Sequence, residues 1–118
     1  MSKVILNVGL NNNPYGFDVL RDYFIQRKGA KFCRYAVGEW DGVSEPTCVV
    51  SIEMDGDVRE FVERLCGWTN QTAIAVKVDG VGELVYEPSY KGERYVFDED
   101  YFISPTALMN GVRYFKVN

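Results

Sequence analysis

The segment TCVVSIEMDGDVREFVERLC, residues 47–66, decides the fold because it changes from a strand pattern to a helix pattern at one short turn. Residues 47–54 are dense in β-branched side chains, which favour a strand. The triplet DGD then predicts a turn, and Asp57 and Glu60 have the spacing of a capping box. The apolar residues of the helix that follows recur on one face: Val58, Phe61, Val62, Leu65 and Cys66. We expect Gly67 to end this helix.

A strand and a helix are also predicted on the N-terminal side of this segment. Residues 3–10 alternate and are rich in Val, Ile and Leu, which indicates a first strand. Asn13 suits the N-cap of a helix and Pro14 its first position. Gly29 is expected to end that helix in a left-handed conformation, and residues 31–37 read as a second strand.

The complete order of elements is β-α-β-β-α-β. Residues 38–46 are expected to form a polar loop, and residues 72–78 a fourth strand. Each helix is long enough to cross over and return the chain to a parallel neighbour. We therefore predict an α+β fold with a ferredoxin-like core over residues 1–78 and both helices on one face of the sheet. With an extension over residues 79–118, the whole chain, 1–118, is predicted to be a single domain.

Two hairpin signals mark the C-terminal extension. Val78-Asp79-Gly80-Val81 predicts a two-residue turn that leads into a strand over residues 83–86. Met109-Asn110-Gly111-Val112 predicts a second turn, with residues 112–117 as its return strand. Between the two signals the extension is rich in tyrosine. It is an addition that the predicted core does not require.

Composition excludes several classes of function. The 118 residues carry a formal net charge of −4, and such a surface disfavours nucleic acid as a partner. Histidine is absent, so neither a Ser-His-Asp triad nor a Cys/His zinc site can form. Cys33, Cys48 and Cys66 read as buried, reduced thiols. We see no signal peptide and no apolar run of the roughly 20 residues that a membrane helix needs, and therefore expect a cytoplasmic protein.

The loop GLNNNPYG, residues 9–16, is the first candidate binding site. Amide side chains and backbone N–H groups before a helix attract anions, and an aromatic ring stacks on planar ligands. The candidate ligand-binding residues are Asn11, Asn12, Asn13, Tyr15, Lys91 and Arg94. They would suit a small, anionic, nucleotide-like ligand. The loop has no phosphate-binding glycine motif, and the alternative is a purely structural Asn-rich turn.

Aromatic residues outside the core pattern form the second candidate site. The candidate interface residues are Trp40, Trp68, Tyr86, Tyr90 and Tyr95. Tryptophan and tyrosine dominate interface hot spots, so these residues could contact a partner protein or a second copy of the chain. The alternative is that they cover the face of the sheet that the two helices leave open.

Two short motifs carry a resemblance. The stretch LNVGLN, residues 6–11, and Glu45-Pro46-Thr47 before a Val-rich strand resemble small bacteriophage accessory proteins that have no established activity as a family. The resemblance covers the first half of the chain. It implies a protein that binds a component of host defence or its signal molecule in the cytoplasm of the host cell.

We therefore expect a non-enzymatic binding protein with no catalytic residue, metal or cofactor, whose partner is a host protein or a small anionic ligand. One alternative is a homo-oligomeric structural or assembly module. Another is a small carboxylate- or metal-dependent enzyme built on Asp55, Asp57, Asp98 and Asp100.

Overall fold

The computed structural model describes residues 1–95 and the backbone of residues 116–117. The strands are β1 (Ser2–Gly9), β2 (Phe32–Trp40), β3 (Val43–Met54), β4 (Ala73–Val78), β5 (Val81–Tyr86) and β6 (Lys116–Val117). Helix α1 (Phe17–Asp22) continues directly as a π-helical turn, η1 (Tyr23–Arg27), and α2 (Val58–Thr69) is the second helix. The result is a small mixed α/β domain with a β-rich order of elements.

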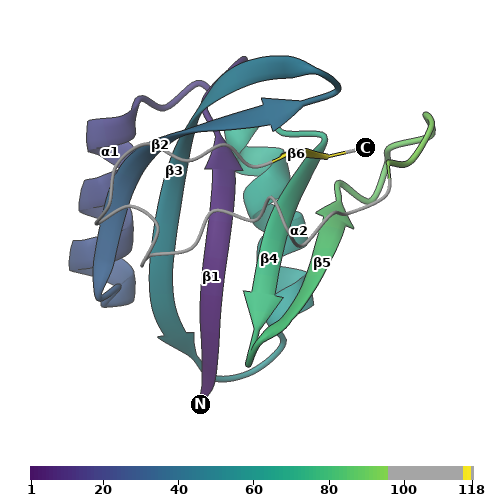
Figure 1. The fold of residues 1–118 in the computed structure, drawn as a ribbon. Coiled ribbons are helices and arrows are strands. Elements are labelled where there is room, and N and C mark those ends of the chain that lie inside the picture. The colour runs from purple at the N-terminus through teal and green to yellow at the C-terminus, as the bar shows by residue number, and fades with distance from the viewer. Residues whose placement is uncertain (96–115, 118) are drawn as a thin grey trace.

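One sheet contains all of the described strands, in the order β5-β4-β1-β3-β2-β6 (Figure 1). Strands β1 to β5 pair antiparallel throughout, and β6 pairs in parallel with β2. The expectation that each helix returns the chain to a parallel neighbour was wrong. Strand β3 lies between β1 and β2, and β1 lies between β3 and β4, so each crossover skips one position.

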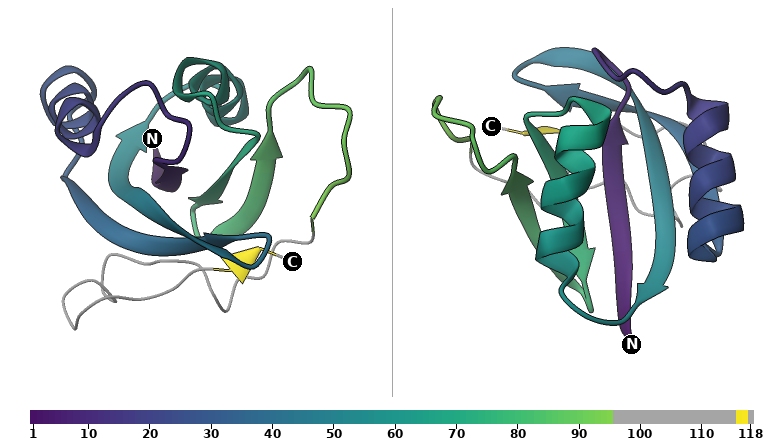
Figure 2. Two further views of the ribbon diagram at one scale, coloured as in Figure 1. Left: turned by 90° about the horizontal axis from the view of Figure 1, so that it is seen from above. Right: turned by 180° about the vertical axis from the view of Figure 1, so that it is seen from behind.

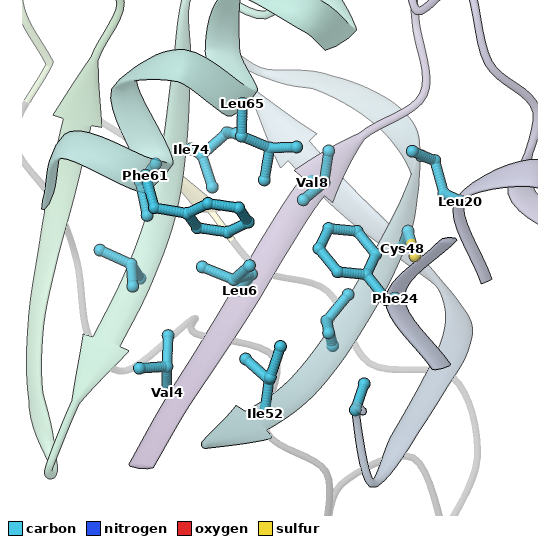
Figure 3. Close-up of a cluster of buried hydrophobic side chains, with 14 of the residues drawn as sticks. Val4, Leu6, Val8, Leu20, Phe24, Cys48, Ile52, Phe61, Leu65 and Ile74 are labelled. Carbon is cyan, nitrogen blue, oxygen red and sulfur yellow. The ribbon is translucent and has the colours of Figure 1, made fainter. Parts of the chain in front are cut away.

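Both helices lie on one face of the sheet, as predicted (Figure 2). The main core lies between them and the sheet, and Figure 3 shows side chains from both layers pointing into it. Strand β1 contributes alternate residues, Val4, Leu6 and Val8, each at most 1 % exposed. Phe24 and Leu65 enter from the helices and are equally buried. Burial of such side chains contributes about 1.5–3 kcal/mol each, so this layer is a major stabilising contact.

The first helix begins later than the sequence predicts. It starts at Phe17, with Gly16 at the N-cap, instead of at Pro14. Asn13 is not a helix cap, because its side chain is engaged in the turn before the helix. Its Oδ1 accepts the Tyr15 N–H at 2.9 Å, and its Nδ2 donates to the Gly9 carbonyl at 3.0 Å. These bonds hold the Asn-rich segment as a structured turn.

The second helix ends later than predicted. Gly67 continues the helix, which runs to Thr69. The left-handed residue is instead Asn70, with φ of 55°. Thr69 is fully buried and its hydroxyl donates to the Leu65 carbonyl at 2.7 Å, which fixes the last turn. The predicted start is confirmed: the Asp57 side chain accepts the Glu60 N–H at 3.1 Å.

The expected polar loop over residues 38–46 is instead a continuous β-hairpin. Strands β2 and β3 pair up to Trp40 and Val43, which leaves a two-residue turn at Asp41 and Gly42. Both turn residues have positive φ, 51° and 79°. The dipeptide Asp-Gly is a strong signal for this kind of turn, but the polar residues on both sides of it give the whole stretch the composition of a loop.

The β4–β5 hairpin was predicted correctly. Val78 pairs with Val81, and Asp79 and Gly80 form the turn with φ of 48° and 85°. The second hairpin signal, residues 109–112, lies outside the described residues. Of the expected return strand, Lys116–Val117 is described, as β6.

Candidate functional site

An apolar groove lies between the two helices on the outer surface of the helical layer. Its volume is about 190 Å³. Tyr15, Val19, Leu20, Tyr23, Leu65, Trp68 and Thr69 line it, and together they form the interhelical groove. Three of them expose much of their surface: Tyr15 by 42 %, Val19 by 55 % and Trp68 by 49 %. Large exposed apolar residues that lie together make this groove a candidate interaction surface.

Helical spacing brings these residues to the groove. Val19 and Tyr23 lie four residues apart on one helix, and Leu65 and Trp68 lie three apart on the other, so each pair shares a face. The rings of Tyr23 and Trp68 meet edge to face across the groove, with centroids 6.3 Å apart and an interplanar angle of 88°. This contact connects the two helices and leaves much of the indole of Trp68 open to a partner.

Positive charge gathers around Tyr23, at one end of the groove. The Lys28 ammonium lies 6.0 Å from the centre of the Tyr23 ring and 5.3 Å from that of Phe61. Burial raises the pKa of Tyr23, and the charges of Arg27 and Arg64 partly offset that effect. Arg64 pairs with a carboxylate of its own helix at 3.8 Å. Among the described residues, neither Arg27 nor Lys28 lies within ion-pair distance of a carboxylate.

A second, polar cavity lies at the end of the sheet where β1 finishes. Its volume is about 250 Å³. Three segments meet there: the Asn-rich turn, the β2–β3 hairpin and the connection from α2 to β4. The residues that line this sheet-end cavity are Asn11, Asn12, Trp40, Asp41, Val43, Glu45, Asn70, Gln71, Thr72 and Ala73.

Side-chain amides connect these segments across the cavity. Asn70 Nδ2 donates to the Asn12 carbonyl at 3.1 Å, and Gln71 Nε2 donates to the Asn11 carbonyl at 2.9 Å. The Asn11 N–H in turn donates to Glu45 Oε2 at 3.3 Å. The cavity walls are therefore hydrogen-bonded to one another over sequence separations of 34 to 60 residues.

The six predicted ligand-binding residues do not form one site. Asn11 and Asn12 line the sheet-end cavity, whereas Tyr15 lines the interhelical groove and Asn13 belongs to the turn between them. Lys91 is exposed. The Arg94 guanidinium lies 4.4 Å from the centre of a tyrosine ring in the extension, so it does not join the amide residues.

All of the predicted interface residues except Trp68 belong to a chain of aromatic contacts that continues into the extension. Tyr86 and Tyr90 stack with centroids 5.2 Å apart, and Trp40 and Tyr95 meet edge to face at 5.1 Å. The Tyr95 N–H donates to the Tyr86 hydroxyl, which joins the two pairs. Trp40 and Tyr95 also pack on a small buried cluster, Ala36, Val49 and Ala75. These aromatic residues therefore cover part of the sheet face that the two helices leave open, which is the alternative stated for them above.

The cysteines are buried, free thiols, as expected. Cys33 Sγ and Cys48 Sγ lie 2.7 Å apart on neighbouring strands. Burial raises the pKa of Cys66 to about 12, and the hydrogen bond with Cys33, together with burial, raises the pKa of Cys48. Such thiols are poor nucleophiles at neutral pH. The described part of the chain holds no cluster of three or more side chains suited to a metal ion.

Sequence reasoning missed Glu45 and Gln71, the residues that give the cavity its chemistry. In the sequence, Glu45 belongs to a short motif and to a stretch that has the composition of a polar loop. Gln71 lies in a connection between elements, and its 9 % exposure depends on packing that a single sequence does not reveal.

Comparison with known proteins finds no matching family model, no matching curated protein and no matching solved structure. Among the residues that the structure describes, no helix is long and apolar enough to span a membrane.

Proposed function

We propose that this chain is a non-enzymatic binding protein that holds a partner protein in the interhelical groove. The observation that carries this proposal is the row of exposed apolar side chains, Tyr15, Val19 and Trp68, around a groove of about 190 Å³. Exposed tryptophan and tyrosine beside a pocket are the residue types that dominate binding energy at protein interfaces.

The chemistry of the groove specifies its occupant as a short amphipathic segment with acidic residues at one end. Apolar side chains of such a segment would cover Val19 and Trp68, where exposed carbon needs an apolar partner. Its carboxylates would lie at the other end, near Arg27 and Lys28, which lack acidic partners among the described residues. Charge complementarity of this kind fixes the direction in which a segment binds.

A small anionic ligand is less well supported than a partner protein. The charged residues that line the sheet-end cavity are Asp41 and Glu45, both acidic, and Lys91 and Arg94 do not line it. An anion in that cavity would face repulsion instead of attraction.

The proposal also includes a fold family and a bacteriophage origin. The antiparallel order β4-β1-β3-β2 with both helices on one face supports a ferredoxin-like arrangement with β5 added at one edge. The resemblance of residues 6–11 to bacteriophage accessory proteins supports a host protein as the partner and the host cytoplasm as the location.

The test is selection of binders from a display library of random short peptides on the immobilised chain. We expect the enriched peptides to combine large apolar residues with Asp or Glu. Trp68→Ala should weaken their binding at least about thirtyfold, as for an interface hot spot. The double variant Arg27→Glu, Lys28→Glu should weaken it about tenfold. Val81→Ala, which removes an even more exposed apolar side chain at the β4–β5 turn, is the matched control.

Three outcomes would overturn the proposal. Enriched peptides could be basic, or they could bind the Trp68→Ala variant as tightly as the original chain. Light scattering could also show a dimer that Trp68→Ala converts to a monomer, in which case a second copy of the chain occupies the groove.

A further inference from the structure

The sheet-end cavity contains two hydrogen-bond acceptors that converge over a glycine. A Cβ placed on Gly9 would lie 2.5 Å from Glu45 Oε2 and 2.6 Å from Gln71 Oε1. The two oxygens are therefore no more than about 5 Å apart, and a single donor group that approaches from the side away from Gly9 could reach both with bonds of about 2.9 Å. A side chain at this position would displace the ends of both neighbouring side chains.

Neither acceptor is fully used within the described chain. Gln71 is 9 % exposed, and its Nε2 donates to the carbonyls of Asn11 and Thr69, at 2.9 and 3.0 Å. Its Oε1 accepts no hydrogen bond from a described group. Glu45 Oε2 accepts one long bond, from the Asn11 N–H at 3.3 Å. Both oxygens therefore keep lone pairs that a donor group entering the cavity could use.

The rest of the lining favours a positive charge on that ligand. Glu45 and Asp41 are the charged residues of the lining, and Asp41 lies near enough to the Tyr95 hydroxyl to raise the pKa of that tyrosine. No lysine or arginine is among the residues that line the cavity. Trp40 adds an aromatic wall, and an indole ring attracts ammonium groups and packs against short carbon chains.

We propose that the sheet-end cavity binds a small primary amine in its protonated form. The ammonium group donates to Glu45 Oε2 and Gln71 Oε1, and the ligand's carbon chain packs on Trp40. A protonated amine supplies three donors and one positive charge, which matches an unused amide oxygen beside a carboxylate. This site is separate from the interhelical groove, so either can exist without the other.

The test is an NMR titration of the ¹⁵N-labelled chain with n-butylamine at neutral pH. The probes n-butanol and butyrate have the same carbon chain without the positive charge. We expect butylamine to shift the Trp40 indole and Gln71 side-chain signals saturably. The Trp68 indole, in the groove, should stay in place. Butanol should bind at least about tenfold more weakly, and butyrate should cause no saturable shift.

A second experiment removes the negative charge of Glu45 from the proposed site. Glu45→Gln should weaken butylamine binding at least about tenfold. Asp55→Asn, which removes the same charge from an exposed residue at the other end of β3, should leave it unchanged. A third test uses the original chain and lowers the pH. Butylamine binding should be lost, because burial raises the pKa of Glu45, so that this carboxylate becomes protonated at a higher pH than an ordinary carboxyl group.

The proposal fails if butanol or butyrate matches butylamine, or if the Trp40 signal does not saturate. It also fails if Glu45→Gln binds like the original chain. Displacement of butylamine by an equal concentration of potassium chloride would assign the cavity to inorganic cations instead.

Discussion

At the scale of single residues, a few positions decide whether the sheet-end cavity exists. Gly9 gives its side-chain space to Glu45 and Gln71. Asn12, Asp41 and Asn70 adopt positive φ, of 59°, 51° and 55°, around the same cavity. Asn and Asp tolerate this conformation better than other residues with a side chain. The turns that shape the cavity therefore depend on these residue types.

Gly9→Ala should destabilise the chain by about 1–3 kcal/mol, because the added methyl would displace the Glu45 and Gln71 side chains. Gly67→Ala is the matched control. Gly67 lies in α2, where an added Cβ would meet no other atom within 4 Å, and we expect the substitution to stabilise the fold by about 0.5–1 kcal/mol. Chemical denaturation of both variants measures the difference. Equal stability of the two would refute the crowding at Gly9.

The buried thiol of Cys66 gives a prediction about pH. With its pKa raised to about 12, Cys66 should react with iodoacetamide at pH 8 roughly a thousandfold more slowly than a free thiol of pKa about 8.5. Because the folded pKa lies above the unfolded one, this residue's contribution to stability is present below pH of about 8.5 and is lost as pH rises towards 12. Mass spectrometry of native and denatured samples measures the rates. Labelling of the native chain within tenfold of a free thiol would contradict the burial.

At the scale of elements, the way in which the first helix ends determines where Lys28 lies. The π-helical turn η1 is followed by Gly29 at φ of 66°, and the Ala30 N–H donates to the Phe24 carbonyl at 2.9 Å. This end places Lys28 over the rings of Tyr23 and Phe61. The basic end of the groove is therefore built by the termination of a helix.

Gly29→Ala should lower the free energy of unfolding by about 1 kcal/mol, since an alanine pays a steric cost in the left-handed region. Gly29→Asn should cost less, because asparagine tolerates that conformation. Thermal and chemical unfolding of the two variants tests this order. If alanine is tolerated as well as asparagine, the helix does not end as described.

The elements and the placement of both helices on one face were predictable from sequence, whereas the order of the strands in the sheet was not. Alternating residues rich in β-branched side chains predict strands β1, β3 and β4, and Asp57 correctly predicts the start of α2. The start of α1 was missed because Asn13 can cap a helix or close a turn, and only the fold decides which. The groove could not be predicted, because Tyr23 and Trp68 meet only once the strand order has brought their helices together.

At the scale of the whole molecule, the two candidate sites have opposite electrostatic character. The interhelical groove has a basic end, whereas the sheet-end cavity has acidic walls, on a chain with a formal net charge of −4. An acidic segment is therefore attracted only locally, by Arg27 and Lys28. At physiological ionic strength such attraction extends about 8 Å.

Raising the salt concentration should consequently weaken groove binding by a selected acidic peptide. We expect a loss of about three- to tenfold between 0.05 and 0.5 M sodium chloride, mostly as slower association. The Arg27→Glu, Lys28→Glu variant should lose this salt dependence. Surface plasmon resonance measures both rates, and affinity that does not respond to salt would exclude a role for the basic end.

The most direct test of partner binding in the groove is an NMR measurement on the ¹⁵N-labelled chain with a selected peptide. The two tryptophans report on the two sites, Trp68 on the interhelical groove and Trp40 on the sheet-end cavity. We predict that the peptide shifts the Trp68 indole signal and leaves that of Trp40 in place. A peptide that shifts Trp40 and not Trp68 would contradict the groove as the binding surface.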